Sequence, residues 1–326
     1  MAIDVTYTNG VIAAREKYLL KDKIFRLCEL SAEDAFRALI ESGYGNGVAV
    51  GSDVYAFEEL IKAEEESLDK FIREYAPNQS DKGYLLSPRD FHNAKALLKA
   101  AYLNTDSEKM LAPQGEIEIS LLAACVKEKD FSSLEKVNSL LKRACEETVS
   151  MMENETVSGA EIGRIFERAA YEHYATLAKR NATLKKLLSH RVDTTNILTA
   201  FRADEETQAQ KEYLSGGKLT KKQLSALFSQ NEDEVIAAFK GTDYQDFVAD
   251  CLETRRKGLP YSNAEKIRDS YEMAFFSKIK YELKNNQPFL YYVYRRRIEN
   301  ANVRILFVCL LAGLSEGEIK RRLRTV

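Results

Sequence analysis

Few side chains in this chain of 326 residues have the types and spacing that catalysis requires. Three histidines occur, His92, His173 and His190, and each is expected at the surface or at its boundary with the core. Glu172 precedes His173, but no second histidine follows at the spacing of an HExxH zinc site. Neither a GxSxG nucleophile elbow nor a GxxxxGK(S/T) phosphate loop is present. The sequence therefore predicts no catalytic site, no metal site and no cofactor.

One glycine-rich stretch, GYGNGVAVGS at residues 43–52, resembles a phosphate cradle. It follows an amphipathic helical pattern rather than a strand, it has no lysine at its end, and Asp53 would repel an anion there. We interpret it as a flexible loop between helices. The acidic run AEEESLDK, residues 63–70, lacks the DDxxD spacing that binds Mg²⁺ in helical prenyl-chain enzymes, so we interpret it as a solvated helix face.

Composition excludes several further classes of protein. The net charge is −2, so the whole chain is not predicted to bind nucleic acid. Five cysteines lie far apart without a CxxC pair, and the N-terminus lacks the basic and apolar regions of a secretory signal. Both features are typical of a reduced cytosolic protein. The longest apolar run, residues 305–314, is shorter than the about 20 residues that a membrane-spanning helix needs.

The segments that carry these candidate residues are predicted to be helical. Prolines number five and glycines fifteen, and apolar residues recur at helical spacing, as they do between Ser158 and His190. No run of alternating β-branched residues occurs, so the predicted fold class is all-α. Ser87-Pro88 is expected to start a helix, with Ser87 as its N-cap. Further helix starts are predicted at capping pairs: Ser31/Asp34, Ser132/Glu135, Ser158/Glu161, Thr220/Gln223 and Ser315/Glu318.

A weak internal repeat places an asparagine at a similar position in four helical segments, three of which carry an acid three residues earlier and one a threonine. The segments are TYTNGVIAAR at 6–15, DFHNAKALLK at 90–99, DTTNILTAFR at 193–202 and ENANVRILFV at 299–308. The segments LAPQGEI at 111–117 and LSGGKL at 214–219 take similar places after the second and third copies. The spacing predicts three units of about one hundred residues. Their expected boundaries are 1–85 plus 290–326, then 86–188, then 189–289.

In the first three segments a base follows the asparagine by six residues, whereas the fourth has Val308 there. Geometry restricts what the acid and the base can do. The acid is interpreted as compensating the helix dipole in the first turn, with Asp90 at the third position after Ser87. At about 100° per residue, the base nine positions after the acid lies on the opposite face of the helix. Arg15, Lys99 and Arg202 are therefore expected to contact another helix, the alternative being ordinary solvated bases.

The C-terminal segment is basic, with eight Lys or Arg against three Glu from Arg295 onward. Residues 315–323 are predicted to form a short capped helix, docked on the body by Leu314, Ile319 and Leu323. Its bases are expected to stay mostly exposed, either as a solvated face or as contacts to an acidic partner surface or anionic lipid. These candidate partner contacts are Lys320, Arg321, Arg322 and Arg324.

Residues 288–323 resemble the C-terminal signature of the C subunit of bacterial and archaeal V/A-type ATPases, the counterpart of the d subunit in vacuolar ATPases. The opening of the chain and residues 192–203 are similar to other segments of this family. The family usually has a lysine between Arg304 and Gly313, and this chain has none. The residues that carry the resemblance as family-motif positions are Tyr7, Asn9, Arg15, Asp193, Asn196, Arg202, Tyr291, Tyr292, Glu299, Asn302, Arg304 and Gly313.

The resemblance implies three similar helical subdomains arranged as a pseudo-threefold funnel. It implies a non-catalytic rotor protein at the cytoplasmic face of the membrane, peripheral to it. There it would be the socket between the central shaft, built of D-type and F-type subunits, and the membrane proteolipid ring that carries Na⁺ or H⁺. No nucleic acid and no small-molecule substrate is expected. The alternatives are a free-standing all-α scaffold or adaptor, and an all-α enzyme.

Overall fold

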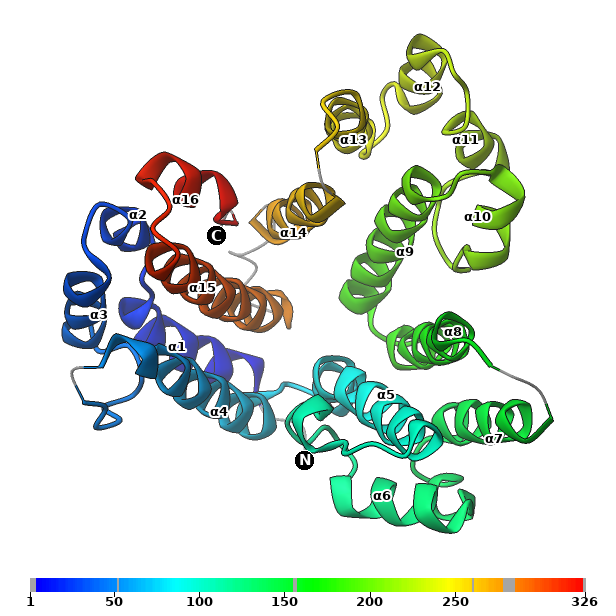
Figure 1. Ribbon diagram of the computed structural model, residues 1–326, viewed down its shortest axis with the longest axis horizontal. Coiled ribbons are helices and arrows are strands. Elements are labelled where there is room, and N and C mark those ends of the chain that lie inside the picture. The colour runs from blue at the N-terminus through cyan, green and yellow to red at the C-terminus, as the bar shows by residue number, and fades with distance from the viewer. Residues whose placement is uncertain (1–3, 52, 155–156, 260, 278–284, 325–326) are drawn as a thin grey trace. The chain divides into compact units, whose positions relative to one another are not determined.

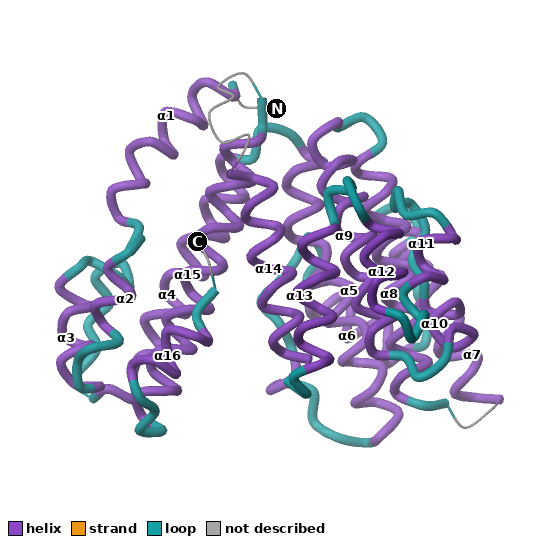
Figure 2. Tube along the Cα trace, turned by 90° about the horizontal axis from the view of Figure 1, so that it is seen from above, coloured by secondary structure: helices purple, strands orange, loops and turns teal. Residues whose placement is uncertain are grey.

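The computed structural model describes residues 4–51, 53–154, 157–259, 261–277 and 285–324. Within these ranges the chain consists of helices and connecting loops, without a strand (Figure 2). The predicted all-α fold class is therefore confirmed. None of the described helices is long and apolar enough to cross a membrane.

The chain divides into two compact units. Unit 1 consists of Met1–Asn78 together with Ser229–Val326, and unit 2 consists of Gln79–Phe228. The ribbon is labelled by element in Figure 1. The three-repeat division and its funnel arrangement stay predictions.

Unit 1 is organised around one long helix, α15 (Gln287–Leu311). Figures 1 and 2 show α15 beside α4 (Phe57–Tyr75), and it also packs on α1, α14 and α16. The aromatic core lies at this contact, where the Phe307 ring centroid is 5.2 Å from that of Phe57 and 6.0 Å from that of Phe36. The other helices of the unit are α1 (Val5–Arg15), α2 (Lys23–Leu27), α3 (Ala32–Glu41), α12 (Glu232–Phe239), α13 (Gln245–Arg256), α14 (Tyr261–Ser277) and α16 (Glu316–Arg322).

Unit 2 is built around α5 (Gln79–Leu103), which packs on α6 (Ile119–Glu128), α7 (Ser139–Asn154) and α8 (Gly159–Ala178). A second long helix, α9 (Ala182–Arg202), packs on α8 and on α10 (Glu206–Glu212). The remaining helix, α11 (Lys221–Ala226), contacts α9.

Most of the predicted helix starts are correct. The Ser31 side chain accepts a hydrogen bond from the Asp34 amide at 3.1 Å, and capping boxes form at Ser158, Thr220 and Ser315. Ser132 is an exception, because it begins a short 3₁₀ turn between the buried side chains of Phe131 and Leu134. The following helix is capped instead by Asn138, whose Oδ1 accepts from the Leu141 amide at 3.0 Å.

The predicted helix start at Ser87-Pro88 is wrong, because α5 continues through Pro88. Proline removes one backbone hydrogen bond within a helix, a local loss that tertiary packing can outweigh. The preceding residues Leu85, Leu86 and Ser87 are all buried, at 1%, 0% and 2% exposure. Packing against the neighbouring helices therefore holds the two halves of α5 in one element.

Candidate functional site

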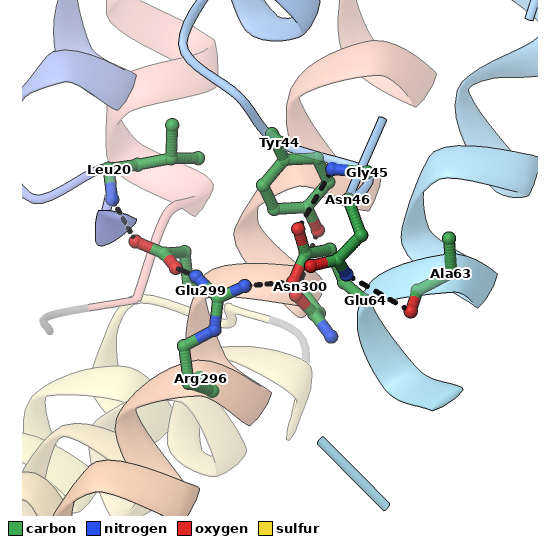
Figure 3. Close-up of polar contacts among 9 residues, drawn as sticks. All are labelled: Leu20, Tyr44, Gly45, Asn46, Ala63, Glu64, Arg296, Glu299 and Asn300. Carbon is green, nitrogen blue, oxygen red and sulfur yellow. Dashed lines mark hydrogen bonds and ion pairs between the residues drawn. The ribbon is translucent and has the colours of Figure 1, made fainter. Parts of the chain in front are cut away.

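The interior of unit 1 contains three ionic side chains in direct contact. Arg296 and Glu299, one turn apart on α15, form an ion pair, and Arg296 also pairs with Glu64 of α4 (Figure 3). These residues are 6%, 2% and 5% exposed. Buried ions of this kind are tolerated when they are paired and hydrogen-bonded. The cluster therefore fixes α4 against α15 at one point, and we call it the buried triad.

Each carboxylate of the buried triad also binds a loop. Glu299 accepts a hydrogen bond from the Leu20 amide, and Glu64 accepts one from the Gly45 amide at 2.8 Å. Beside them, the Tyr44 hydroxyl donates to Oδ1 of Asn300 at 2.8 Å (Figure 3). The triad therefore joins the segment after α1, the glycine-rich loop after α3, and the two central helices.

The electrostatics of the triad are unbalanced, because two carboxylates face one guanidinium. Burial raises the pKa of Glu299, although Arg296 and the backbone amides act to lower it. Burial alone would lower the pKa of Arg296, but Glu299 and Glu64 outweigh that effect and leave it raised. Burial also raises the pKa of Tyr44 well above its usual range, with Glu64 acting in the same direction. Arg296 therefore stays charged, and the arrangement depends on it.

The glycine-rich loop is a helix-to-helix loop, as predicted. Gly43, Gly45, Asn46 and Gly47 all have positive φ, a conformation that favours glycine. A side chain at Gly45 would place its Cβ 2.5 Å from Leu60 Cδ2, so the backbone approaches α4 closely there. The prediction that residues 63–70 are a solvated face is wrong at Glu64, which is buried and accepts a hydrogen bond from the loop at Gly45.

A cavity of about 310 Å³ lies beside the triad. Two of the family-motif residues, Arg15 and Tyr292, meet here. The Arg15 guanidinium lies 4.9 Å from the centroid of the Phe71 ring, and burial raises the pKa of the Tyr292 hydroxyl. The lining residues are Arg15, Tyr18, Gly43, Asn46, Glu64, Ser67, Leu68, Tyr292 and Arg296.

The repeated asparagines make the same contact at three places. Asn93 Nδ2 donates to the Ala112 carbonyl at 3.1 Å, and its Oδ1 accepts from the Ala112 amide at 2.8 Å. Asn196 makes the same pair of bonds with Leu214, at 2.9 and 2.8 Å. Asn302 makes it with Arg324, again at 2.9 and 2.8 Å. We call each of these a clip, because a side-chain amide fixes a later segment to its helix.

The acids three residues before the asparagines complete two of the clips. Asp90 accepts from the Glu116 and Ile117 amides at 3.0 Å, and Asp193 accepts from the Lys218 and Leu219 amides at 2.9 and 3.0 Å. The interpretation of Asp90 as a first-turn residue that compensates the helix dipole is therefore wrong. Asp90 lies in the middle of α5, buried, and binds a distant loop.

Glycine explains why the segments 111–117 and 214–219 resemble each other. A Cβ at Gly115 would lie 2.2 Å from Asp90 Oδ1, and a Cβ at Gly217 would lie 2.1 Å from Asp193 Oδ1. Both distances are far below contact, so only glycine lets the loop backbone reach the carboxylate. The sequence repeat is therefore a repeat of hydrogen bonding.

Two bases of the repeat contact another helix, as expected. Arg15 of α1 lies over Phe71 of α4, and Lys99 Nζ donates to the carbonyl of Gly159 in α8 at 3.0 Å. Their partners are an aromatic ring and a backbone carbonyl rather than carboxylates. Arg202, the third base, is an exposed residue at the end of α9.

The C-terminal helix α16 forms as predicted, with the Ser315 amide donating to Glu318 Oε2 at 3.0 Å. Ile319 and Leu323 are buried at 0% and 4% exposure, and Leu314 packs beside them. Arg321 and Arg322 are exposed, as expected.

The expectation of exposure is wrong for the other two bases of this segment. Lys320 bonds to Glu29 at 3.1 Å and to Glu316 at 2.6 Å, and Arg324 bonds to Asp269 at 2.7 Å. Both side chains are partly buried, because ion pairs with the body of unit 1 draw them inward.

The remaining family-motif residues are spread over unit 1. Tyr7 is 61% exposed, and its ring centroid lies 6.2 Å from that of Tyr75. Tyr291 is buried under the Arg295 guanidinium, and Arg304 bonds to Glu58 at 2.8 Å. Asn9 is partly buried on α1, and Gly313 has a φ of 71° just after α15, where a helix commonly ends. They do not form one site with the buried triad.

Sequence reasoning missed Glu64, Arg296, Tyr44 and Asn300. One signal for Glu64 was present, because it occupies a position of the apolar stripe of α4, between Leu60 and Leu68. It was also wrong to expect all three histidines at the surface or its boundary, since His190 is only 8% exposed on α9. It belongs to the long buried face of that helix.

These features define an all-α protein held together by buried side-chain contacts to loops. Residues 8–322 match the family model described as the ATP synthase (C/AC39) subunit. The chain therefore belongs to this family, which confirms the resemblance found in its sequence.

Named relatives agree with this assignment. The chain is 24% identical over 340 residues to the C subunit of the A-type ATP synthase of Haloquadratum walsbyi, covering 97% of this chain and 96% of that protein. It is 23% identical over 250 residues to the C subunit of the V-type ATP synthase of Thermus thermophilus, covering 75% and 77%. It is 21% identical over 334 residues to the C subunit of the V-type sodium ATPase of Enterococcus hirae, covering 98% and 97%.

Proposed function

We propose that this chain is a non-catalytic central-stalk subunit of a V/A-type ATPase. It acts as the socket that couples the central shaft to the membrane proteolipid ring, at the cytoplasmic face of the membrane. The observation that carries the proposal is the family match across residues 8–322. Relatives aligned over nearly the whole chain are named as the C subunits of such complexes, which supports the same role.

The internal construction of the chain suits a part that transmits torque. In the clips, the side-chain amides of Asn93, Asn196 and Asn302 each make two hydrogen bonds to the backbone of a later segment and so fix it to a helix. The buried triad joins α4 to α15, and a buried ion pair resists displacement because separating its partners leaves a charge unpaired. A protein built in this way would pass on a load with little internal slip.

The exposed bases of α16 are the proposed contacts to an acidic partner surface. Arg321 and Arg322 extend from a helix whose apolar face is docked, so their charges are available outside unit 1. The paired bases Lys320 and Arg324 hold the helix in place. This division assigns partner contact to two residues and internal support to the other two.

Isolation from native membranes tests the proposal. The tagged chain, expressed in its own cells, is purified from gently solubilised membranes, and the co-purified proteins are identified by mass spectrometry. We expect shaft subunits and proteolipid to appear in fixed proportion to the chain. Isolation of the chain alone, or with an unrelated bound metabolite, would contradict the proposal and favour a scaffold or an enzyme.

A further inference from the structure

The first helix of unit 1 buries few of its own side chains. Thr8 and Ile12 are the buried residues of α1, and Tyr7 is 61% exposed. Thr8 Oγ1 donates to the Tyr75 carbonyl at 3.0 Å, and Arg15 lies over Phe71. Figure 2 shows α1 at the edge of unit 1, leading into α2. A helix with so little buried apolar area depends on individual contacts to stay docked.

The end of this N-terminal segment has two attachments, the buried side chains of Leu19 and Leu20 and one carboxylate that binds the backbone. The amides of Leu20 and Lys21 both donate to Glu299, which is 2% exposed. Lys21 has a φ of 49°, in the left-handed region that is unfavourable for a residue with a Cβ. We infer that the hydrogen bond to Glu299 compensates for this backbone strain.

Comparison of the three clips shows that Glu299 has a different target from the other acids. Asp90 and Asp193 bind amides 25 to 27 positions later, in the loop after their own helix. Glu299 has the same place relative to its asparagine but binds Leu20, which is 279 positions away in the sequence. It is also one methylene longer than aspartate. The third acid of the repeat therefore serves the attachment of the N-terminal segment.

We propose that residues 4–18 form an arm that detaches from unit 1 as a separate unit, and that Glu299 controls this detachment by holding Leu20 and Lys21. The arm consists of α1 and the 3₁₀ helix Glu16–Tyr18, with Asp4 as its N-cap. Beyond the attachment point, Ile24 and Leu27 of α2 are buried in the core of unit 1. Opening therefore stops at Leu20 and leaves that core in place. The inference is independent of the proposed function, because it concerns the chain by itself.

Hydrogen exchange of the Glu299→Asp variant tests the proposal. Aspartate keeps the negative charge beside Arg296 but is too short to reach the Leu20 amide. We expect amide exchange in residues 5–21 to become about tenfold faster or more, because hydrogen bonds to an ionised group are strong. Exchange in α4, α15 and α16 should change by less than about twofold.

The matched control is Asp193→Asn, the equivalent acid in a clip of unit 2. It should speed exchange in residues 214–219 and leave residues 5–21 unchanged. Two results would overturn the proposal: unchanged exchange of the arm in Glu299→Asp, or an even increase over the whole of unit 1. The first would show that other contacts hold the arm, and the second that Glu299 only supports the core.

The wild-type chain provides a second test that does not depend on the folding of any variant. Native-state exchange is measured at increasing, low concentrations of urea. Amides of α1 should exchange through an opening with little urea dependence, because a small surface is exposed, whereas those of α15 should show the full dependence of global unfolding. Equal urea dependence in α1 and α15 would contradict a separate arm.

Discussion

Arg296 is the residue on which the interior of unit 1 depends most, because its guanidinium pairs with both Glu64 and Glu299. Changing Arg296 to Ala should lower the free energy of unfolding by about 3–5 kcal/mol, since it leaves buried carboxylates unpaired. The control, Arg304→Ala on the same helix, removes an exposed pair with Glu58 and should lower it by less than about 1 kcal/mol. Urea unfolding measures both. Equal losses of unfolding free energy in the two variants would show that the buried triad stabilises unit 1 no more than an exposed ion pair does.

Gly217 of unit 2 is predicted not to tolerate a side chain. Its change to Ala places a Cβ 2.1 Å from Asp193 Oδ1, so the loop must move and the clip must open. We expect a loss of about 1–3 kcal/mol in the free energy of unfolding. Gly163→Ala is the control, because that Cβ meets nothing within 4 Å in a helix and should be neutral or stabilising. If Gly217→Ala unfolds like the wild type, the proposed role of glycine is wrong.

His173 makes the stability of unit 2 depend on pH. Burial lowers its pKa, and its ring lies 5.7 Å from that of Phe91. A folded pKa below the unfolded value of about 6.5 means that the unfolded chain binds more protons, so stability is lost as pH falls from about 6.5 through the lowered pKa. Between pH 7.5 and 5.0, the urea midpoint should fall further for the wild type than for His173→Phe. If the urea midpoints of the two proteins fall equally with pH, His173 is not the cause of the pH dependence.

At the scale of elements, α16 is predicted to contact a partner through exposed bases, while other bases of the same segment hold it on unit 1. The double change Arg321→Glu, Arg322→Glu should alter the free energy of unfolding by less than about 0.5 kcal/mol, because both side chains are exposed. It should weaken attachment of the catalytic head to membranes most visibly at moderate salt, because screening there has already weakened the electrostatic contacts that remain. The measurement is sedimentation of ATPase activity with membranes across a salt series.

The control for this helix is the double change Lys320→Glu, Arg324→Glu. It breaks the ion pairs with Glu29 and Asp269, so it should lower the thermal unfolding temperature. Normal attachment of the head in the Arg321→Glu, Arg322→Glu variant at every salt concentration would show that these two bases only solubilise the helix.

Helical periodicity and capping pairs predicted the helices well, because both depend on neighbours within a turn or two. The start of α5 could not be placed this way, since packing of Leu85 and Leu86 carries the helix through Pro88. The clips were visible as a repeat of asparagine and glycine, but their function was not. Asp90 and Gly115 meet only after the chain has turned back, and the pattern of one helix does not show such a contact.

The buried triad was beyond the sequence for a related reason. Glu64 and Arg296 are 232 positions apart, and each stands in a run of like charges that is typical of a solvated face. Only folding shows which member of each run points inward. The place of Glu64 in the apolar stripe of α4 was the available sign.

At the scale of the whole molecule, the chain is proposed to couple the shaft to the ring without catalysing a reaction itself. The most direct measurement uses membranes from cells that lack the chain, with ATP hydrolysis and ATP-driven ion transport measured before and after the purified chain is added back. We predict that without the chain the catalytic head still hydrolyses ATP while transport is lost, and that the added chain restores transport. Transport at the normal ratio to hydrolysis in membranes that lack the chain would contradict this coupling role.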